Sequence, residues 1–207
     1  MTSRAGGALQ RLLASLSGLL AGLRTAFARS TDGRSTPPTR PHALPSPVSV
    51  VIPALNEERR IADVVRYALS DTACTEVIVI DDCSIDATHE LAEAAGAHVL
   101  TSSMLGKGES MLDGLNAAAH DIVVFLDGDL AGMQPEIVSR LAEPIRAGRA
   151  DLVKAAFGRA AGRVTELTAK PMLRVFFPEL ARLAQPLGGI VAARKALNNA
   201  NVPREGR

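Results

Sequence analysis

Residues 48–58 read Val-Ser-Val-Val-Ile-Pro-Ala-Leu-Asn-Glu-Glu, an apolar, β-branched run that stops at a proline and passes into polar residues. β-Branched residues favour strands, and proline cannot donate to a strand ladder. Similar apolar runs at 76–80 and 122–126 end at aspartates. Stretches with helical spacing lie between these runs. This alternation predicts an α/β fold in which a mainly parallel sheet is covered by helices on both faces.

The predicted elements follow one another from Val48 onward. Strands are expected at 48–52, 76–80, 98–100, 122–126 and 152–155, and helices at 57–69, 86–95, 108–119 and 135–147. Ligands of such sheets bind beyond the carboxyl ends of the strands. Polar residues gather at those ends in this sequence, so we expect the functional site there.

Composition and fingerprints exclude several classes of function. A net charge of +1 gives no global attraction for nucleic acid, and the absence of Trp argues against base-stacking platforms. The sequence has no GxxxxGK[ST] motif, so a P-loop is excluded, and Gly106-Lys107-Gly108 lacks the third glycine of a dinucleotide fingerprint. The two cysteines lack CxxC spacing, which favours reduced, structural thiols in a cytoplasmic protein.

The first 47 residues differ from the rest of the chain. Residues 1–29 contain Arg but no acidic residue, and their leucines form one stripe of a helix too short to span a bilayer. Three interpretations stay open: a basic amphipathic helix on a membrane or partner, an extension without a role, or a signal peptide. Residues 30–47 are rich in Pro, Ser, Thr and Arg, which indicates a linker. We therefore divide the chain into residues 1–47 and a domain at 48–207.

Asp127-Gly128-Asp129 is a candidate metal and diphosphate site. A diphosphate leaving group needs its charge neutralised, and Mg²⁺ or Mn²⁺ held by carboxylates can do this. The alternative is a strand-to-helix turn that favours Asp and Gly. Asp81 and Asp82 pose a similar choice, because a carboxylate there can accept hydrogen bonds from a nucleoside or simply stabilise a loop.

The order of these motifs resembles the family-2-like GT-A glycosyltransferases. The segments 53–58, 81–86 and 127–129 follow the first, second and fourth strands, and the resemblance runs from Val48 to about Leu130. The resemblance implies that Asp127 and Asp129 are catalytic and that Asp129 binds the metal. It also implies that the donor nucleotide is held by Pro53, Ala54, Leu55, Asn56, Glu57, Asp81 and Ser84.

Four segments further along the chain, at 106–111, 162–167, 177–180 and 185–189, are similar to those of the glucosyl-3-phosphoglycerate synthases within that family, and the resemblance then covers residues 48 to about 197. These are retaining enzymes that use UDP-glucose and 3-phosphoglycerate. The resemblance implies that Lys107 lies beside the phosphates and that Gly162, Arg163 and Thr165 hold the acceptor's phosphate and carboxylate. A helix N-terminus beside an arginine can bind such an anion. A capped helix with a solvated arginine remains an alternative.

Two departures from these relatives bear on function. Ile190 stands where they carry a glutamate that is thought to face the sugar. They also continue beyond the end of this chain with a portion that supplies a histidine metal ligand, so the chain is expected to be truncated at its C-terminus. We expect residues 188–197 to form or approach a strand near the metal site. We further expect weak nucleotide binding and little transferase activity.

The predicted function is metal-dependent transfer of a sugar, glucose by preference, from a UDP-sugar to a small phosphorylated acceptor such as 3-phosphoglycerate. The cofactor is expected to be Mg²⁺ or Mn²⁺, and no nucleic-acid partner is expected. The alternatives are a lipid-phosphate glycosyltransferase at the membrane and an inactive nucleotide-binding fragment. Peripheral membrane contact through residues 1–29 and homodimer formation are left open.

Overall fold

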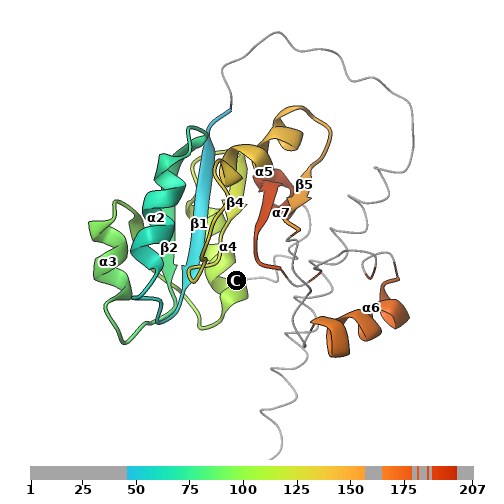
Figure 1. The fold of residues 1–207 in the computed structure, drawn as a ribbon, viewed down its shortest axis with the longest axis horizontal. Helices are drawn as coiled ribbons and strands as arrows, with labels where there is room; N and C mark the ends of the chain where they lie inside the picture. Colours follow the sequence, from blue (N-terminus) through green and yellow to red (C-terminus); the bar gives the residue numbers. More distant parts are fainter. Residues whose placement is uncertain (1–45, 157–164, 179–180, 182–185, 187, 200–207) are drawn as a thin grey trace, which may run out of the picture.

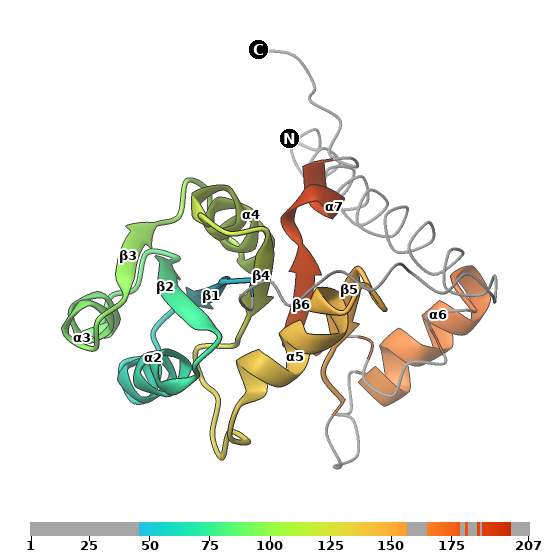
Figure 2. The same ribbon diagram turned by 90° about the horizontal axis from the view of Figure 1, so that it is seen from above.

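Six strands of this chain form one mixed sheet (Figure 1), and they lie in the order β3-β2-β1-β4-β6-β5 (Figure 2). The structure is a computed structural model, and it describes residues 46–156, 165–178, 181, 186 and 188–199. The strands are β1 (Val48–Ala54), β2 (Cys74–Asp81), β3 (His98–Thr101), β4 (Ile122–Phe125), β5 (Leu152–Lys154) and β6 (Val191–Arg194).

The first four strands in the chain are parallel, and β1 lies in the middle of them, paired with β2 and β4. Strand β6 is inserted between β4 and β5 and runs antiparallel to both. The predicted mainly parallel sheet is therefore confirmed, with β6 as the antiparallel exception. The expectation of a strand within 188–197 is also confirmed. This strand is followed directly by the short helix α7 (Lys195–Asn199).

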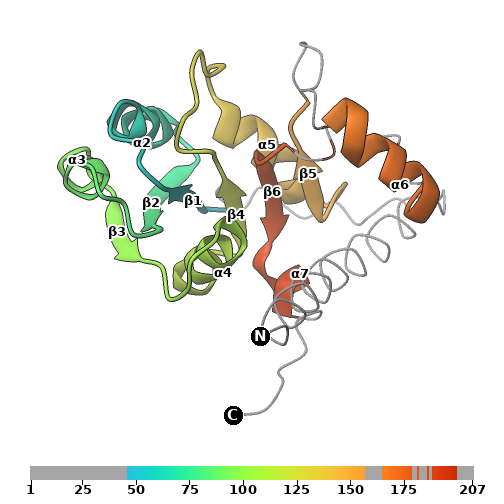
Figure 3. The same cartoon turned by 90° about the horizontal axis from the view of Figure 1, so that it is seen from below.

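Helices cover both faces of the sheet, as the alternating pattern predicts. Figure 2 shows α2 (Ile61–Ser70), α3 (Thr88–Ala94) and α5 (Ile137–Arg146) on one face and α4 (Lys107–Ala117) on the other. The π-helix η1 (Thr165–Ala169) continues into α6 (Lys170–Phe176), which lies beyond the β5 edge in the views of Figures 2 and 3. No helix in the described part of the chain is both long and apolar enough to cross a membrane.

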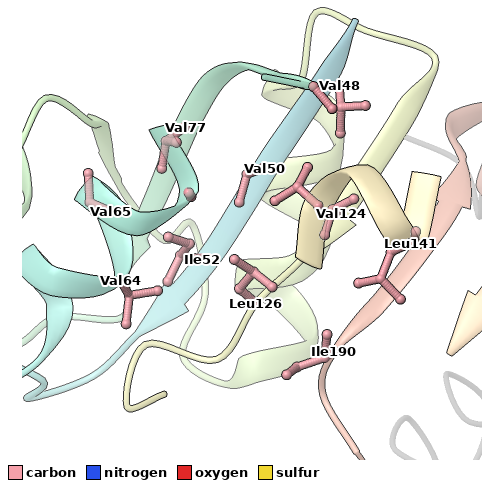
Figure 4. Close-up of a cluster of buried hydrophobic side chains, with 14 of the residues drawn as sticks. Val48, Val50, Ile52, Val64, Val65, Val77, Val124, Leu126, Leu141 and Ile190 are labelled. Carbon is pink, nitrogen blue, oxygen red and sulfur yellow. The ribbon is translucent and has the colours of Figure 1, made fainter. Parts of the chain in front are cut away.

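Two apolar clusters lie on the two faces. The larger one joins β1, β2 and β4 to α2 and α5, and Figure 4 shows its valine, isoleucine and leucine side chains gathered between these elements. The smaller one packs α4 against the other face through Leu115. Gly114 permits this close approach, because a Cβ there would lie 2.2 Å from Cγ1 of Val51. The sheet is thus a rigid support for the loops at its edges.

The structure corrects two predicted boundaries. Strand β1 continues through Pro53 to Ala54 instead of stopping at residue 52. The pairing of β1 with β4 ends at Val51. The missing N–H of Pro53 therefore costs no hydrogen bond with β4. Helix α2 begins at Ile61, four residues later than predicted. Residues 58–60 form a turn instead, and the N–H groups of residues 57 and 58 bond to the loop after β2.

The predictions for residues 1–29 and for nearly all of the linker at 30–47 lie outside the described residues. The structure describes only the last two linker residues, and the side chain of Arg146 binds the carbonyl of Ser46. The division at residue 48 coincides with the first residue of β1 and otherwise stays a prediction.

Candidate functional site

The loops after β1 and β2 are tied together at the carboxyl edge of the sheet. Asn56 adopts a left-handed conformation with φ of 56°, which asparagine tolerates better than most residues. Its N–H donates to Oγ of Ser84 at 2.9 Å, and its Oδ1 accepts from the N–H of Ile85 at 2.9 Å. The N–H of Glu57 donates to Oγ1 of Thr88 at 2.7 Å. These reciprocal bonds fix the shape of both loops.

The other predicted residues of the first loop differ in exposure. Pro53 and Ala54 are the last residues of β1, and Ala54 is buried. Leu55 is 51% exposed, so its side chain is available at the edge of the sheet. This part of the loop can offer backbone groups and one apolar side chain to a flat ring.

Asp81 and Asp82, both buried at the end of β2, have different partners. Asp81 accepts from the N–H of Ser84 at 3.0 Å, and its other oxygen lies 3.5 Å from Nδ1 of His89. Asp82 accepts from the N–H of Gly106 at 2.9 and 3.1 Å. Gly106 has φ of +123°, which favours glycine, and it precedes α4. Asp82 therefore anchors the start of α4, whereas Asp81 is held by Ser84 beside His89, and its nucleoside-binding role stays a prediction.

Lys107 is the first residue of α4, and its Nζ forms an ion pair with Oδ1 of Asp127. The lysine side chain is 56% exposed and the aspartate 25%. An exposed pair of this kind contributes only about 0–1 kcal/mol, so a bound anion can displace it. The N-terminus of α4 adds a partial positive charge at the same place. Lys107 and α4 thus present positive charge beside Asp127-Gly128-Asp129, the DGD segment.

Asp127 and Asp129 follow the central strand β4, and Gly128 is buried between them. Asp127 is half-buried, whereas Asp129 is exposed. A Cβ at Gly128 would lie 3.3 Å from Cγ of Glu57, so the glutamate packs directly beside this turn. The first loop and the DGD segment therefore meet, as the parallel topology predicts.

Negative charge gathers at this point. The pKa of Glu57 is raised by burial first, then by the negative charges of Asp129 and Asp86; Lys107 lowers it, and Asp127 adds the smallest raising effect. Like charges held close together disfavour ionisation. A cation bound here would relieve that repulsion.

The residues present fit a divalent metal of the magnesium or manganese type. Carboxylate oxygens are the ligands that these hard cations prefer, and Mg²⁺ is commonly bound through one or two carboxylates plus substrate phosphates. In the described part of the chain no three His, Cys, Asp or Glu side chains form a closed metal cluster. Asp127 and Asp129 thus suit an open site that a diphosphate completes.

The sequence analysis missed Lys154 and Gly189 at this edge. Lys154 ends β5, and its Nζ donates to the carbonyl oxygen of Gly188. A Cβ at Gly189 would lie 2.1 Å from Oδ1 of Asp127, so the backbone there touches the carboxylate. A lysine at the carboxyl end of a predicted strand was the available signal for the first. For Gly189 the only signal was the strand expected near the metal site at 188–197, because the contact itself joins distant segments.

Ile190 is 3% exposed and belongs to the larger core cluster, together with Leu126 and Leu141 (Figure 4). The side chain at this position is therefore part of the core in this chain.

The predicted acceptor residues are only partly placed. Gly162 and Arg163 lie outside the described residues, and Thr165 is the first residue of η1. A helical segment does begin at Thr165, as expected, but the acceptor role of all three residues stays a prediction. His98 and His120 take part in no metal cluster among the described residues.

Comparisons with known proteins agree with this geometry. The model of the family described as Glycosyl transferase family 2 matches residues 49–202. A glucosyl-3-phosphoglycerate synthase of Mycolicibacterium paratuberculosis is 39% identical over 175 residues, covering 72% of this chain and 53% of that protein. An undecaprenyl-phosphate 4-deoxy-4-formamido-L-arabinose transferase of Klebsiella pneumoniae is 36% identical over 109 residues, covering 46% of this chain and 32% of that protein.

A solved structure is also similar. The crystal structure of glucosyl-3-phosphoglycerate synthase from Mycobacterium tuberculosis, in complex with Mn²⁺, UDP-glucose and phosphoglyceric acid, superposes with a TM-score of 0.68 at 38% identity. The match covers 76% of this chain and 63% of that one. The chain spans about half the length of the curated relatives it matches. The sheet, the ordered loops and the family match together lead to one conclusion: this chain belongs to glycosyl transferase family 2 and has the GT-A fold.

Proposed function

We propose that this chain provides the donor half of a metal-dependent glycosyltransferase that moves glucose from UDP-glucose to a small phosphorylated acceptor such as 3-phosphoglycerate. The observation that carries the proposal is the meeting of Asp127, Asp129 and Lys107 at the end of the central strand, beside two interlocked loops. Relatives named for this reaction share 33–39% identity with the chain, which supports the substrate class.

In the proposed site the nucleoside lies along the loops after β1 and β2. The residues assigned to the donor are Pro53, Ala54, Leu55, Asn56, Glu57, Asp81, Ser84 and Lys107. Asp81 has one oxygen bonded to Ser84 and the other directed toward His89, so it is oriented before a ligand arrives. Preorganised acceptors of this kind lower the cost of binding, because few side chains need to be ordered.

The leaving diphosphate is proposed to lie between Asp127, Asp129 and the start of α4. A divalent metal on Asp129 would neutralise charge on the diphosphate as the bond between the glucose and the diphosphate breaks. Asp127 would orient the donor, and Lys107 would exchange its ion pair with Asp127 for the phosphates. The similarity to the glucosyl-3-phosphoglycerate synthases favours attack from the leaving-group face and a retaining outcome.

The acceptor is proposed to contact Gly162, Arg163 and Thr165. An arginine offers paired N–H donors to a phosphate or carboxylate, and the first turn of a helix adds further donors. The start of η1 at Thr165 is consistent with this arrangement.

A lipid-phosphate acceptor at the membrane is the second candidate. It is favoured by the similarity to the Klebsiella undecaprenyl-phosphate transferase and by the basic, leucine-striped residues 1–29. Sedimentation with anionic liposomes distinguishes a chain that works at a membrane surface from one that works in solution. The chain should sediment only if residues 1–47 bind the surface, and the variant that lacks them should stay in solution in either case.

A thermal-shift panel of nucleotides and sugar nucleotides, each with Mn²⁺, tests the donor assignment. A ligand that binds only the folded state stabilises that state. The stabilisation grows with the logarithm of the ligand concentration once this concentration exceeds Kd. UDP and UDP-glucose should raise the unfolding temperature more than the adenine and guanine analogues. An equal shift for all nucleotides would refute the uridine assignment, and hydrolysis of UDP-glucose separates an enzyme from an inactive binding fragment.

A further inference from the structure

Lys154 is a half-buried lysine with no role in the donor site as assigned above. It is the last residue of β5, where it pairs with Val191 of β6. Its pKa is lowered by burial, raised by the negative charge of Asp127 and lowered again by Lys107. Its ammonium group is therefore desolvated and lies within electrostatic reach of the diphosphate side of the site.

A desolvated ammonium group is costly unless it is hydrogen-bonded or paired. The partner of Lys154 Nζ is the carbonyl oxygen of Gly188. A lysine that only filled space at a strand end would extend its ammonium into water. Lys154 instead gives up solvation to hold one specific point of the backbone, two residues before the core residue Ile190.

The segment 188–190 is held from several sides. Ile190 is anchored in the core, and its carbonyl accepts from the N–H of Ala155 at 3.0 Å. Gly189 lies against Asp127, with its Cβ position only 2.1 Å from Oδ1. The backbone at Gly189 therefore limits where the Asp127 carboxylate can rest, and the bond from Lys154 to Gly188 limits where that backbone can rest.

We infer that Lys154 is a positioning residue of the donor site: it holds the Gly188–Gly189 backbone against Asp127 and so fixes the carboxylate that meets the metal–diphosphate. This inference rests on the proposed function for its consequence in binding. The structural part of it, the restraint on Gly189, stands without a ligand.

The test uses the full chain in four forms: wild type, Lys154→Met, Lys154→Arg and Lys195→Met. Methionine keeps the length and apolar stem of lysine but cannot donate, whereas arginine keeps a charged donor. Lys195 is the matched control, because its Nζ also donates to a backbone carbonyl, that of Ala118 at 2.5 Å. Lys195 follows β6 at its other end, near the start of β4, away from the carboxyl edge.

Two quantities are measured for each form: the affinity for UDP with Mn²⁺ by calorimetry, and hydrogen exchange of residues 188–194 without nucleotide. Loss of one hydrogen bond to a charged group corresponds to roughly 10- to 100-fold in affinity, so Lys154→Met should weaken UDP binding by about that factor and speed exchange at 188–191. Lys154→Arg should recover most of both, and Lys195→Met should change neither. If Lys154→Met does not fold, Lys154→Gln takes its place with the same expectation.

Unchanged exchange at 188–191 and wild-type UDP affinity in Lys154→Met, even with a lowered unfolding temperature, would overturn the inference and leave Lys154 with a purely structural role. A wild-type chain that binds no UDP would instead overturn the proposed function. In that event the exchange measurement alone still decides whether Lys154 restrains Gly189.

Discussion

The substitution Gly189→Ala should damage the donor site while leaving the fold intact. The added Cβ would lie 2.1 Å from Oδ1 of Asp127 and 2.7 Å from both Cγ and Oδ2. Ordinary contacts of a Cβ begin at 3.4 Å, so the carboxylate has to move by about 1 Å. Loss of one hydrogen bond to a charged group, about 1.5–3 kcal/mol, corresponds to roughly 10- to 150-fold in affinity. Asp127 can move because its side chain is partly exposed and its ion pair with Lys107 is worth only about 0–1 kcal/mol.

The assay compares UDP affinity in Mn²⁺ with the free energy of unfolding, for Gly189→Ala and for Gly114→Ala. A Cβ at Gly114 would meet Cγ1 of Val51 at 2.2 Å inside the core, and overpacking of a core costs about 1–3 kcal/mol. Gly189→Ala should therefore lose roughly 10- to 150-fold in affinity with stability nearly unchanged, and Gly114→Ala should show the reverse. If Gly189→Ala binds UDP as the wild type does, the backbone at 189 does not control Asp127 and the site geometry is wrong.

Three further predictions concern other parts of the chain. Because the pKa of Glu57 is raised above 4.5 in the folded state, its ionisation removes stability as pH rises through the folded pKa. Glu57→Gln should raise the unfolding temperature at pH 7 but not at pH 3, and an equal shift at both would contradict this. In a chain extended to the length of its relatives, Arg163→Ala should weaken use of 3-phosphoglycerate by roughly 10- to 150-fold with UDP binding unchanged, and normal acceptor kinetics would reduce that loop to a capped helix. Ile190→Glu should destabilise the chain by more than about 3 kcal/mol in urea unfolding, and a stable variant would show that position 190 can leave the core.

Local pattern and chain order predict the central sheet and most of the donor side of the site. The strands ending at Asp81 and at Phe125 both run parallel to β1, and parallel strands bring their carboxyl ends to one edge. Asp81 and Asp127 therefore lie at the same edge of the sheet, on the strands that flank β1. The order of the polar segments favours a nucleotide-sugar site over ordinary loop acids, and that role stays a prediction.

Other features depend on contacts between distant segments. Nothing local to Gly188 indicates that β6 enters the sheet antiparallel between β4 and β5, or that this insertion brings Lys154 to Gly188 across 34 residues. Proline usually ends a strand because it lacks the N–H that a neighbouring strand would accept. At Pro53 the pairing with β4 has already ended, so no hydrogen bond is lost. The segment before α2 is bonded to Thr88 and Asp86 of another loop. Tertiary contacts of this kind override local preference.

The central claim is that Asp129 holds a divalent metal that in turn holds the donor's diphosphate. Calorimetric titration of UDP into the chain, in Mn²⁺ and in EDTA, for the wild type and for Asp129→Ala, tests it most directly. The wild type should bind UDP at least roughly tenfold more tightly in Mn²⁺, since the metal bridges the carboxylate and the phosphates. Asp129→Ala should bind UDP weakly and equally in both conditions. Equal wild-type affinity in Mn²⁺ and in EDTA would contradict the claim.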